Sequence, residues 1–414
     1  MKRQFAQIAA WISGLCWCSG LVTVLLASAV QASSLVGLDF LGQAQFATGA
    51  ITVQGTQVGG LSGIAYDPSR NCYYSISDDR SQINPARFYT LSIDLSQGGL
   101  SSDKVAFTDV TLLRDRNGQL FAPLSLDPEG IALTRNHTLW ISSEGDANRS
   151  INPLVGEFTL TGQQLRTLPI PEKFLPSSPA QGIRNNLALE SLTVTPNQQT
   201  LWTATENALV QDGPVATLDL RSPSRLLKYD LSTGKPEQEY LYLTEPVAAA
   251  AKPTTGLSTT GLADLLALDN EGHFLSLERS FSTGVGNTIQ LFEISLAGAD
   301  DISALYSLSA LDLSKLKPVH KKLLLNLNTL NLPLNTSLDN VEGVTFGPLL
   351  PDGRQSLVLV SDNNFSSTQS TQILALGVRI QATRSSSRPN WMGPTLLLLG
   401  GMLLHKQSLF LNGD

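Results

Sequence analysis

The sequence predicts an all-β fold, a β-propeller of four-stranded antiparallel blades. A pattern of two apolar strands occurs five times along the chain, and stretches typical of a third and a fourth strand follow it. A repeat of this length means that one supersecondary unit is used several times, and four antiparallel strands are the blade of a propeller. A degenerate sixth repeat could lie in residues 206–263 or 294–342, so we expect five or six blades.

Each repeat begins with a predicted β-hairpin. Its first arm opens on a small or acidic residue before apolar β-formers, and its second arm ends in Ser or Thr plus an acid. The clearest copy joins residues 129–133 to residues 139–144. The other copies are 62–78, 190–206, 342–362 and a weaker one at 263–278. β-Branched and aromatic arms around turn-forming residues are typical of hairpins.

The remaining strands follow at regular places. Third strands are expected at residues 88–93, 157–160, 225–229, 290–294 and 372–376, and outer strands at segments such as 105–113 and 240–243. The last repeat has no outer strand after it. Residues 35–46 could supply that strand and close the ring, which would leave no exposed sheet edge.

The first residues suggest export. Lys2 and Arg3 precede an apolar stretch that ends in small residues, which is the pattern of a secretory signal peptide; an uncleaved anchor is the alternative. We expect a signal peptide at 1–32, a propeller domain at 33–380 and a Ser/Arg/Pro linker with a short apolar tail at 381–414. Cleavage would leave Cys72 as the one cysteine, without an internal disulfide. The expected location is the periplasm, the cell envelope or the medium.

The net charge and the apolar tail limit the kinds of partner that the chain is expected to bind. The formal net charge is −7, which argues against a nucleic-acid or anionic-membrane partner. The uninterrupted apolar run of the tail is shorter than the ~20 residues that span a bilayer. It could be an interfacial anchor, a sorting tail or an end packed on the ring, and we expect peripheral membrane or envelope contact through it. The chain is expected to be a monomer.

The repeat also gathers acids at one end of the ring. Pairing each opening residue with its closing acid places three carboxylates opposite carboxylates. The expected pairs are Glu129–Glu144, Glu190–Glu206, Glu342–Asp362, Ser62–Asp78 and Ala263–Glu278. Like charges directly opposite each other, about 5 Å apart, are destabilising. A raised carboxyl pKa, a neighbouring Arg or a bound cation would offset this repulsion.

An oxygen-only ligand set without His or Cys suits Ca²⁺, or Mg²⁺, and does not suit Zn²⁺. The candidate metal ligands are Asp78, Glu129, Glu144, Glu190, Glu206 and Asp362. Arg80, Arg149 and Arg279 follow closing acids by one to five residues and are candidates to bind a substrate anion. The alternative is structural, in which the acids cap strands and bind backbone amides or these arginines.

Other hydrolytic chemistry is not expected. No Gly-x-Ser-x-Gly elbow is present, and His137 and His273 fall in hairpin loops at the end away from the acids. His320 lies in a Lys-rich stretch typical of a solvated edge strand, so a Ser-His-Asp triad is not predicted. Trp140 and Trp202 occupy the same place in two repeats, which indicates packing between blades.

The repeated segments resemble a known family. They are 61–66 with 77–80, 127–131 with 143–144, 186–190 with 205–207, and 340–344 with 361–364. In order and spacing they resemble the phytase-like, or "esterase-like activity of phytase", family of secreted bacterial propellers, over about residues 37–380. The resemblance implies a metal-assisted hydrolase of phosphate or other esters, with calcium held by acids at the channel mouth and phosphate held by Arg or Lys. The mouth has more acids than bases, which argues against phytate itself because a hexakisphosphate needs a basic cleft.

Three functions therefore stay open. In the leading one, a bound metal polarises the ester and acidifies a water, a carboxylate such as Glu342 or Glu129 takes the proton, and the substrate is a small-molecule or polymer ester. The second is a non-catalytic propeller that binds a ligand or protein through the same mouth. The third is a metal-dependent sugar-lactone hydrolase. Metal-dependent turnover separates the second from the other two.

Overall fold

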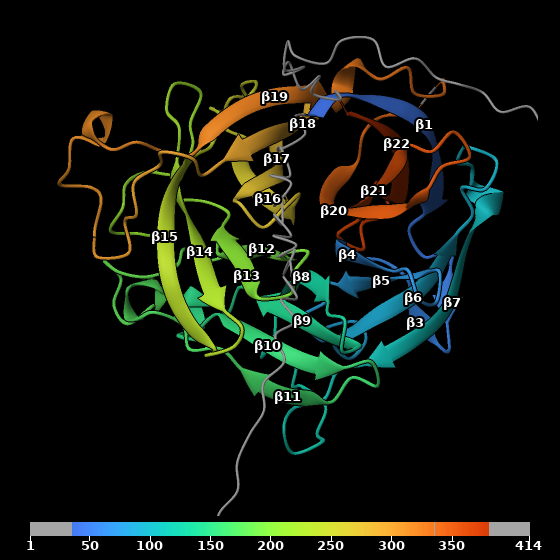
Figure 1. Ribbon diagram of the computed structural model, residues 1–414, viewed down its shortest axis with the longest axis horizontal. Coiled ribbons are helices and arrows are strands. Elements are labelled where there is room, and N and C mark those ends of the chain that lie inside the picture. The colour runs from blue at the N-terminus through green and yellow to red at the C-terminus, as the bar shows by residue number, and fades with distance from the viewer. Residues whose placement is uncertain (1–34, 335, 381–414) are drawn as a thin grey trace, which may run out of the picture. The chain divides into compact units, whose positions relative to one another are not determined.

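The computed structural model describes residues 35–334 and 336–380, and these form a five-bladed β-propeller. Five four-stranded antiparallel sheets surround a central axis (Figure 1). The inner strands β4, β8, β12, β16 and β20 contact one another in turn around this axis. The fold prediction is confirmed, and no sixth blade occurs within the described ranges.

Each blade continues outward from its inner strand. The first contains β4 (Leu61–Asp67), β5 (Cys72–Ser77), β6 (Arg87–Ile93) and β7 (Val105–Leu112). The second contains β8 (Pro128–Leu133), β9 (Thr138–Ser143), β10 (Leu154–Thr159) and β11 (Gln164–Thr167). The third contains β12 (Leu189–Val194), β13 (Thr200–Thr205), β14 (Pro223–Asp230) and β15 (Lys235–Leu243). The fourth contains β16 (Ser258–Ala267), β17 (His273–Ser282), β18 (Gly286–Ser295) and β19 (His320–Asn326).

The fifth blade joins the two ends of the described chain. It contains β20 (Asn340–Leu349), β21 (Gln355–Asp362) and β22 (Ser370–Ile380), and its outer strand is β1 (Leu35–Ala47). Strand β1 pairs antiparallel with β22, as Figure 1 shows by the blue strand beside the red one. The predicted N-terminal outer strand is therefore confirmed, and backbone hydrogen bonds close the ring.

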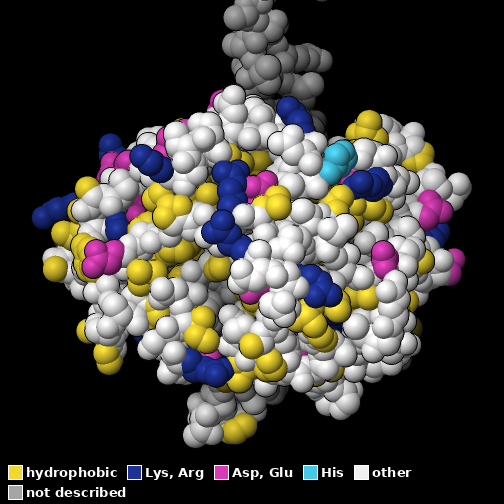
Figure 2. Space-filling model, turned by 90° about the horizontal axis from the view of Figure 1, so that it is seen from below, with side chains coloured by type: hydrophobic (Ala, Val, Ile, Leu, Met, Phe, Trp, Pro, Cys, Tyr) yellow, Lys and Arg dark blue, Asp and Glu magenta, His cyan; other side chains and the backbone are white. Residues whose placement is uncertain are grey.

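Short elements lie outside the blades. A two-stranded ribbon is formed by β2 (Thr52–Val53) and β3 (Thr56–Gln57). The helical turns are η1 (Ser102–Lys104), η2 (Ala147–Arg149), η3 (Glu172–Phe174), η4 (Leu313–Lys315) and η5 (Leu327–Thr329). Figure 2 shows one side of the molecule, where basic, acidic and apolar side chains are interspersed rather than gathered by kind.

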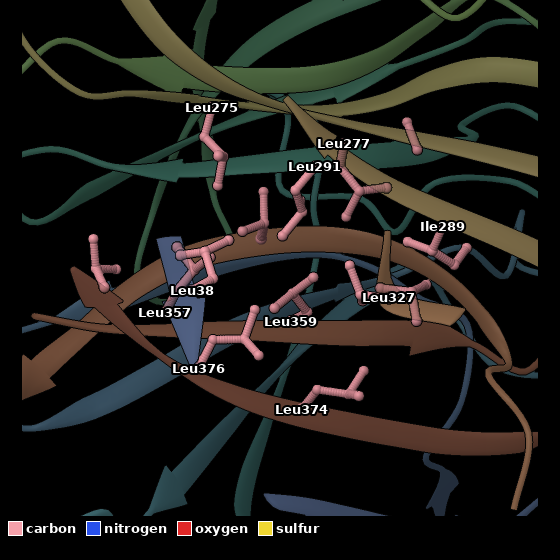
Figure 3. Packing of buried hydrophobic residues seen from close by; sticks show 14 of the residues in the cluster. Leu38, Leu275, Leu277, Ile289, Leu291, Leu327, Leu357, Leu359, Leu374 and Leu376 are labelled. Carbon is pink, nitrogen blue, oxygen red and sulfur yellow. The ribbon is translucent and has the colours of Figure 1, made fainter. Parts of the chain in front are cut away.

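Apolar side chains fill the spaces between blades. Figure 3 shows Leu275 and Leu277 of β17 facing Leu357 and Leu359 of β21, with Leu38 of the closing strand in the same cluster. A fully buried Leu stabilises the folded state by roughly 1.5–3 kcal/mol, so each such layer holds two neighbouring blades together. The predicted interblade packing of tryptophans is confirmed as well.

Both tryptophans pack against the following blade. Trp140 of blade 2 is 1% exposed and belongs to a cluster with Leu192 and Leu201 of blade 3. Trp202 of blade 3 meets the Phe274 ring of blade 4 edge to face, with ring centroids 5.2 Å apart. The same position of the repeat therefore supplies an aromatic side chain to the core between blades, once from blade 2 and once from blade 3.

The predicted signal peptide (1–32) and C-terminal tail (381–414) lie outside the described residues. Among the described residues, no helix is both long enough and apolar enough to cross a bilayer.

Candidate functional site

The inner strand of every blade has a β-bulge at the residue that opens the repeat. Pairing with the next strand shifts register around Ser62, Glu129, Glu190, Ala263 and Glu342. A bulge adds one unpaired residue to its strand and re-aims the side chain there. The predicted direct pairs between opening residues and closing acids are therefore wrong, because each opening residue lies in the bulge and has no residue opposite.

The corrected register gives other neighbours. The Glu144 backbone N–H donates to the Asp127 carbonyl at 3.0 Å, so Asp127 and not Glu129 lies opposite Glu144. Asp362 lies opposite Asn340. Direct opposition of two acids thus occurs at Asp127 and Glu144 instead of at the three predicted pairs. Asp127 was not predicted as a ligand. Its position two residues before Glu129 would have pointed to it if a bulge had been assumed in the inner strand.

Blade 4 differs from the other blades by one position. Ser77, Ser143, Thr205 and Ser361 each lie opposite the residue before the bulge, and in blade 4 Glu278 lies there. Arg279 therefore takes the place that Asp78, Glu144, Glu206 and Asp362 have in the other blades. The Glu278 carboxylate accepts a hydrogen bond from Tyr242 Oη at 2.6 Å and pairs with Lys321. The prediction of Glu278 as a closing acid is wrong by one residue.

Close approach of neighbouring inner strands explains the Glu-Gly sequence. A Cβ atom on Gly130 would lie 2.6 Å from Leu192 Cβ and 2.8 Å from the Glu190 carbonyl oxygen. A Cβ atom on Gly343 would lie 2.9 Å from Gly63 Cα. These contacts are too short for any side chain, so glycine follows the bulge where backbones meet. In blade 4 this position is Asp264, whose carboxylate accepts the Val344 N–H of blade 5 at 2.8 Å.

The bulges and strand ends surround a cavity of about 800 Å³. Its acidic lining consists of Asp78, Glu129, Glu190, Glu206, Asp339, Glu342 and Asp362, and its lining cation is Arg279. Glu144 is buried beside it and accepts a hydrogen bond from the Ala188 N–H. The structure thus brings all six predicted metal ligands, and Glu342, to one end of the channel.

One part of this acidic end is compensated by Arg279. Its guanidinium lies 3.3 Å from Glu206 Oε1 and 3.1 Å from Glu342 Oε1. Burial raises the pKa of Glu206 and of Glu342 to about 7, although Arg279 opposes that rise. Burial alone would lower the pKa of Arg279, but the acids outweigh it and the pKa is raised.

The other part is a group of carboxyls around Glu129. Oxygens of Asp78, Asp127 and Glu129 lie within 4.8 Å of one another, and so do those of Glu129, Glu144 and Glu190. Burial, then the neighbouring acids, raise the pKa of Asp78, Glu129 and Glu190 well above the usual range. Burial raises the pKa of Asp127 to about 7 and that of Glu144 to about 8. After burial, the nearby Asp127 carboxyl contributes most to the raised pKa of Asp78.

The other two predicted anion-binding residues lie outside the cavity lining. Arg80 is half-buried, 3.2 Å from Asp127 Oδ2 and 3.0 Å from Asp146 Oδ2, so it partly compensates the group around Glu129. Arg149 is exposed on η2, and its guanidinium donates to the Leu124 carbonyl at 3.5 Å. Only Arg279 among the three reaches the cavity.

The histidines and the cysteine lie away from the acids. His273 is the first residue of β17, with its Nδ1 2.6 Å from Asp269 of the preceding hairpin loop, and His137 lies in the matching loop of blade 2. His320 is exposed on β19. Burial raises the pKa of the Cys72 thiol, which disfavours the reactive thiolate. Within the described residues, none of these three histidines joins the cavity lining.

Fold and site together define a five-bladed propeller with a carboxyl-lined channel mouth. Residues 56–365 match the family described as "Phytase-like: Esterase-like activity of phytase". The chain belongs to this phytase-like family.

The relatives found beyond the family match are distant. An "Uncharacterized secreted protein" of Arthroderma benhamiae is 25% identical over 208 residues, which is 44% of this chain and 39% of that protein. The catalytic domain of a Coprinopsis cinerea GH62 α-L-arabinofuranosidase is 8% identical, with 83% of this chain and 98% of that one covered at a TM-score of 0.40. A PQQ-bound aldose sugar dehydrogenase of Streptomyces coelicolor is 15% identical, with 84% and 97% covered at a TM-score of 0.32. These structural likenesses are too remote to inform function.

Proposed function

We propose that this propeller is a divalent-metal-assisted hydrolase of phosphate or other esters. The observation that carries the proposal is the convergence of five carboxyls, four of them buried and Asp78 half-buried, with little cationic compensation. Family membership supports it, since the family is described by esterase-like activity. Buried groups with raised pKa values in a cavity are candidates for functional residues.

The donor set fits Ca²⁺, or Mg²⁺. All donors are carboxylate oxygens, which these hard cations prefer. Glu129 belongs to both candidate groups, so it would be a central ligand, with Asp78 and Asp127 on one side and Glu144 and Glu190 on the other. When bound, the cation would polarise the ester oxygen and lower the pKa of a water.

The chain's own residues would do the rest. Glu342 lines the cavity with a pKa of about 7, which suits a group that accepts a proton near neutral pH. Arg279 lies beside Glu342 and would orient an anionic ester oxygen. Glu129, the other predicted base, is better placed as a ligand because two carboxyl groups flank it on each side.

A non-catalytic binding propeller is favoured by one observation. Several acids already have partners within the chain, since Arg80 contacts Asp127 and Arg279 contacts Glu206 and Glu342. A site satisfied in this way could hold a ligand without turnover.

Export of the protein is part of the proposal. The predicted signal peptide supports it, and a distant relative is described as secreted. A protein released to the periplasm, the envelope or the medium would meet more free calcium than a cytosolic protein.

The test is metal content and turnover of the purified mature protein. We expect bound calcium, and hydrolysis of p-nitrophenyl phosphate or p-nitrophenyl acetate that stops on chelation and returns with calcium. Glu129→Gln should lose metal and turnover together, whereas Glu342→Gln should keep the metal and lose at least about 100-fold in kcat. Arg149→Gln is the matched control and should change neither. Absence of both metal and turnover would favour the binding propeller.

A further inference from the structure

We infer that the ligand of this cavity carries one compact apolar group, a short alkyl, acyl or aryl chain, beside a single ester or anionic group. This rests on the proposed function for the reaction, and on the cavity alone for binding. The alternative is a polyol that carries several phosphates.

The cavity is lined by apolar side chains as well as by acids. Five of its lining side chains are large and apolar: Leu187, Val215, Leu257, Phe281 and Leu338. Leu257 is 63% exposed, and Phe281 is half-buried, so both keep surface that a ligand could cover. Covering such surface is favourable because apolar area leaves water.

The register of blade 4 places one of these apolar side chains, Phe281, beside Arg279. Phe281 follows Arg279 by two residues on β17, so both side chains project from the same face. Two residues along a strand are about 6.6 Å. On the paired strand β16, Thr259 lies opposite Phe281 and Gly261 lies opposite Arg279. A ligand whose anionic group met Arg279 would therefore lay the next few carbon atoms against Phe281.

Charge opposes a polyphosphorylated ligand. Arg279 is the one Lys or Arg among the described lining residues, and it already contacts Glu206 and Glu342. A phosphate group carries about −1.5 to −2 charges near pH 7. A single divalent cation and Arg279 can serve one such group, whereas further phosphates would meet the seven acids of the lining.

The test measures binding without turnover. Linear alkylphosphonates from methyl to hexyl are titrated calorimetrically into the calcium-loaded protein. We expect the Kd to fall about fourfold for each added methylene, which corresponds to ~0.8 kcal/mol. Hexane-1,6-bisphosphonate, which ends the same chain in a second charge, should bind more weakly than hexylphosphonate.

Two exposed leucines provide matched variants. Leu257→Ser should reduce the gain per methylene to less than twofold, and Leu349→Ser, which is 68% exposed at the far end of β20, should leave it unchanged. A Kd that does not depend on chain length, or tighter binding of the bisphosphonate, would overturn the inference. Chain-length dependence without hydrolysis of any ester would sustain the inference and defeat the proposed hydrolase.

Discussion

The two parts of the acidic end handle the same repulsion in different ways. Glu206 and Glu342 face Arg279, which the chain itself supplies at the closing position of blade 4. The carboxyls around Glu129 have no such central cation among the described residues, and burial followed by the neighbouring acids raises the pKa of Asp78 and of Glu129. The replacement of a closing acid by Arg279 in blade 4 thus neutralises one part of the acidic end within the chain. The other part keeps carboxyls that can exchange their protons for a metal.

Removal of Arg279 should have the largest effect on stability. Arg279→Met leaves Glu206 and Glu342 buried without their cation, and loss of one partner of a buried ion pair costs about 3–5 kcal/mol. The loss should be full at pH 8 and shrink toward pH 5, where both carboxyls are protonated. Urea unfolding at both pH values measures this.

Arg149→Met is the control for that variant. Its exposed side chain should change the free energy of unfolding by less than about 0.5 kcal/mol. An equal loss in both variants, or a loss for Arg279→Met that does not depend on pH, would contradict the compensation by Arg279.

The backbone beneath the two parts also differs. Blade 2 needs Gly130 for close approach to blade 3, whereas blade 4 has Asp264 at the same position. Gly130→Ala should cost about 1–3 kcal/mol, because overpacking forces the inner strands apart. Gly99→Ala is the control, since its Cβ would lie 3.4 Å from the Leu41 carbonyl oxygen. Similar urea midpoints for both variants would show that the channel backbone tolerates a side chain at residue 130.

Much of the fold was predictable from the sequence, because alternation and turn residues act locally. The hairpins, the third strands and the closing strand β1 follow from such patterns. The bulges were not predictable in this way, since a bulge is set by the contact of each inner strand with the next blade. The sequence does record that contact in Gly63, Gly130 and Gly343, but only the packing shows why.

For the site, residue types were predictable and neighbours were not. Acids that repeat at strand ends converge because the blades share one axis, so Glu129 and Glu190 meet from different blades. The predicted register was off by one residue along the strand and the bulge added one more, so Asp127 instead of Glu129 lies opposite Glu144. In blade 4 the bulge likewise shifts the register, so that Arg279 and not Glu278 occupies the position of the closing acids.

The pH dependence of metal-free stability comes from both parts, since burial also raises the pKa of Glu206 and of Glu342 to about 7. Burial raises the pKa of Asp127 to about 7 and of Glu144 and Asp362 to about 8, whereas unfolded carboxyls titrate near 4. The folded state therefore holds protons that the unfolded state has lost, so metal-free stability should fall as pH rises from about 4 to 8. The slope is ~1.4 kcal/mol per pH unit for each extra proton.

Calcium should flatten that slope, because a bound cation takes the place of the protons that these carboxyls hold. Urea unfolding at pH 5.5, 6.5, 7.5 and 8 with chelator, and again with calcium, measures both curves. Metal-free stability that rises with pH over this range would show that the carboxyls are ionised in the folded protein.

The smallest expected effects differ in sign. At pH 8 without metal, Glu129→Gln should stabilise the protein by about 1 kcal/mol, because it removes one carboxyl from a crowded like-charge group. Glu206→Gln should destabilise it by about 1 kcal/mol, because Arg279 loses a charged partner. Urea unfolding of both variants beside the parent protein decides the matter. Changes of the same sign would mean that Glu129 has a compensating cation after all, and the group around it would then have no electrostatic need for a metal.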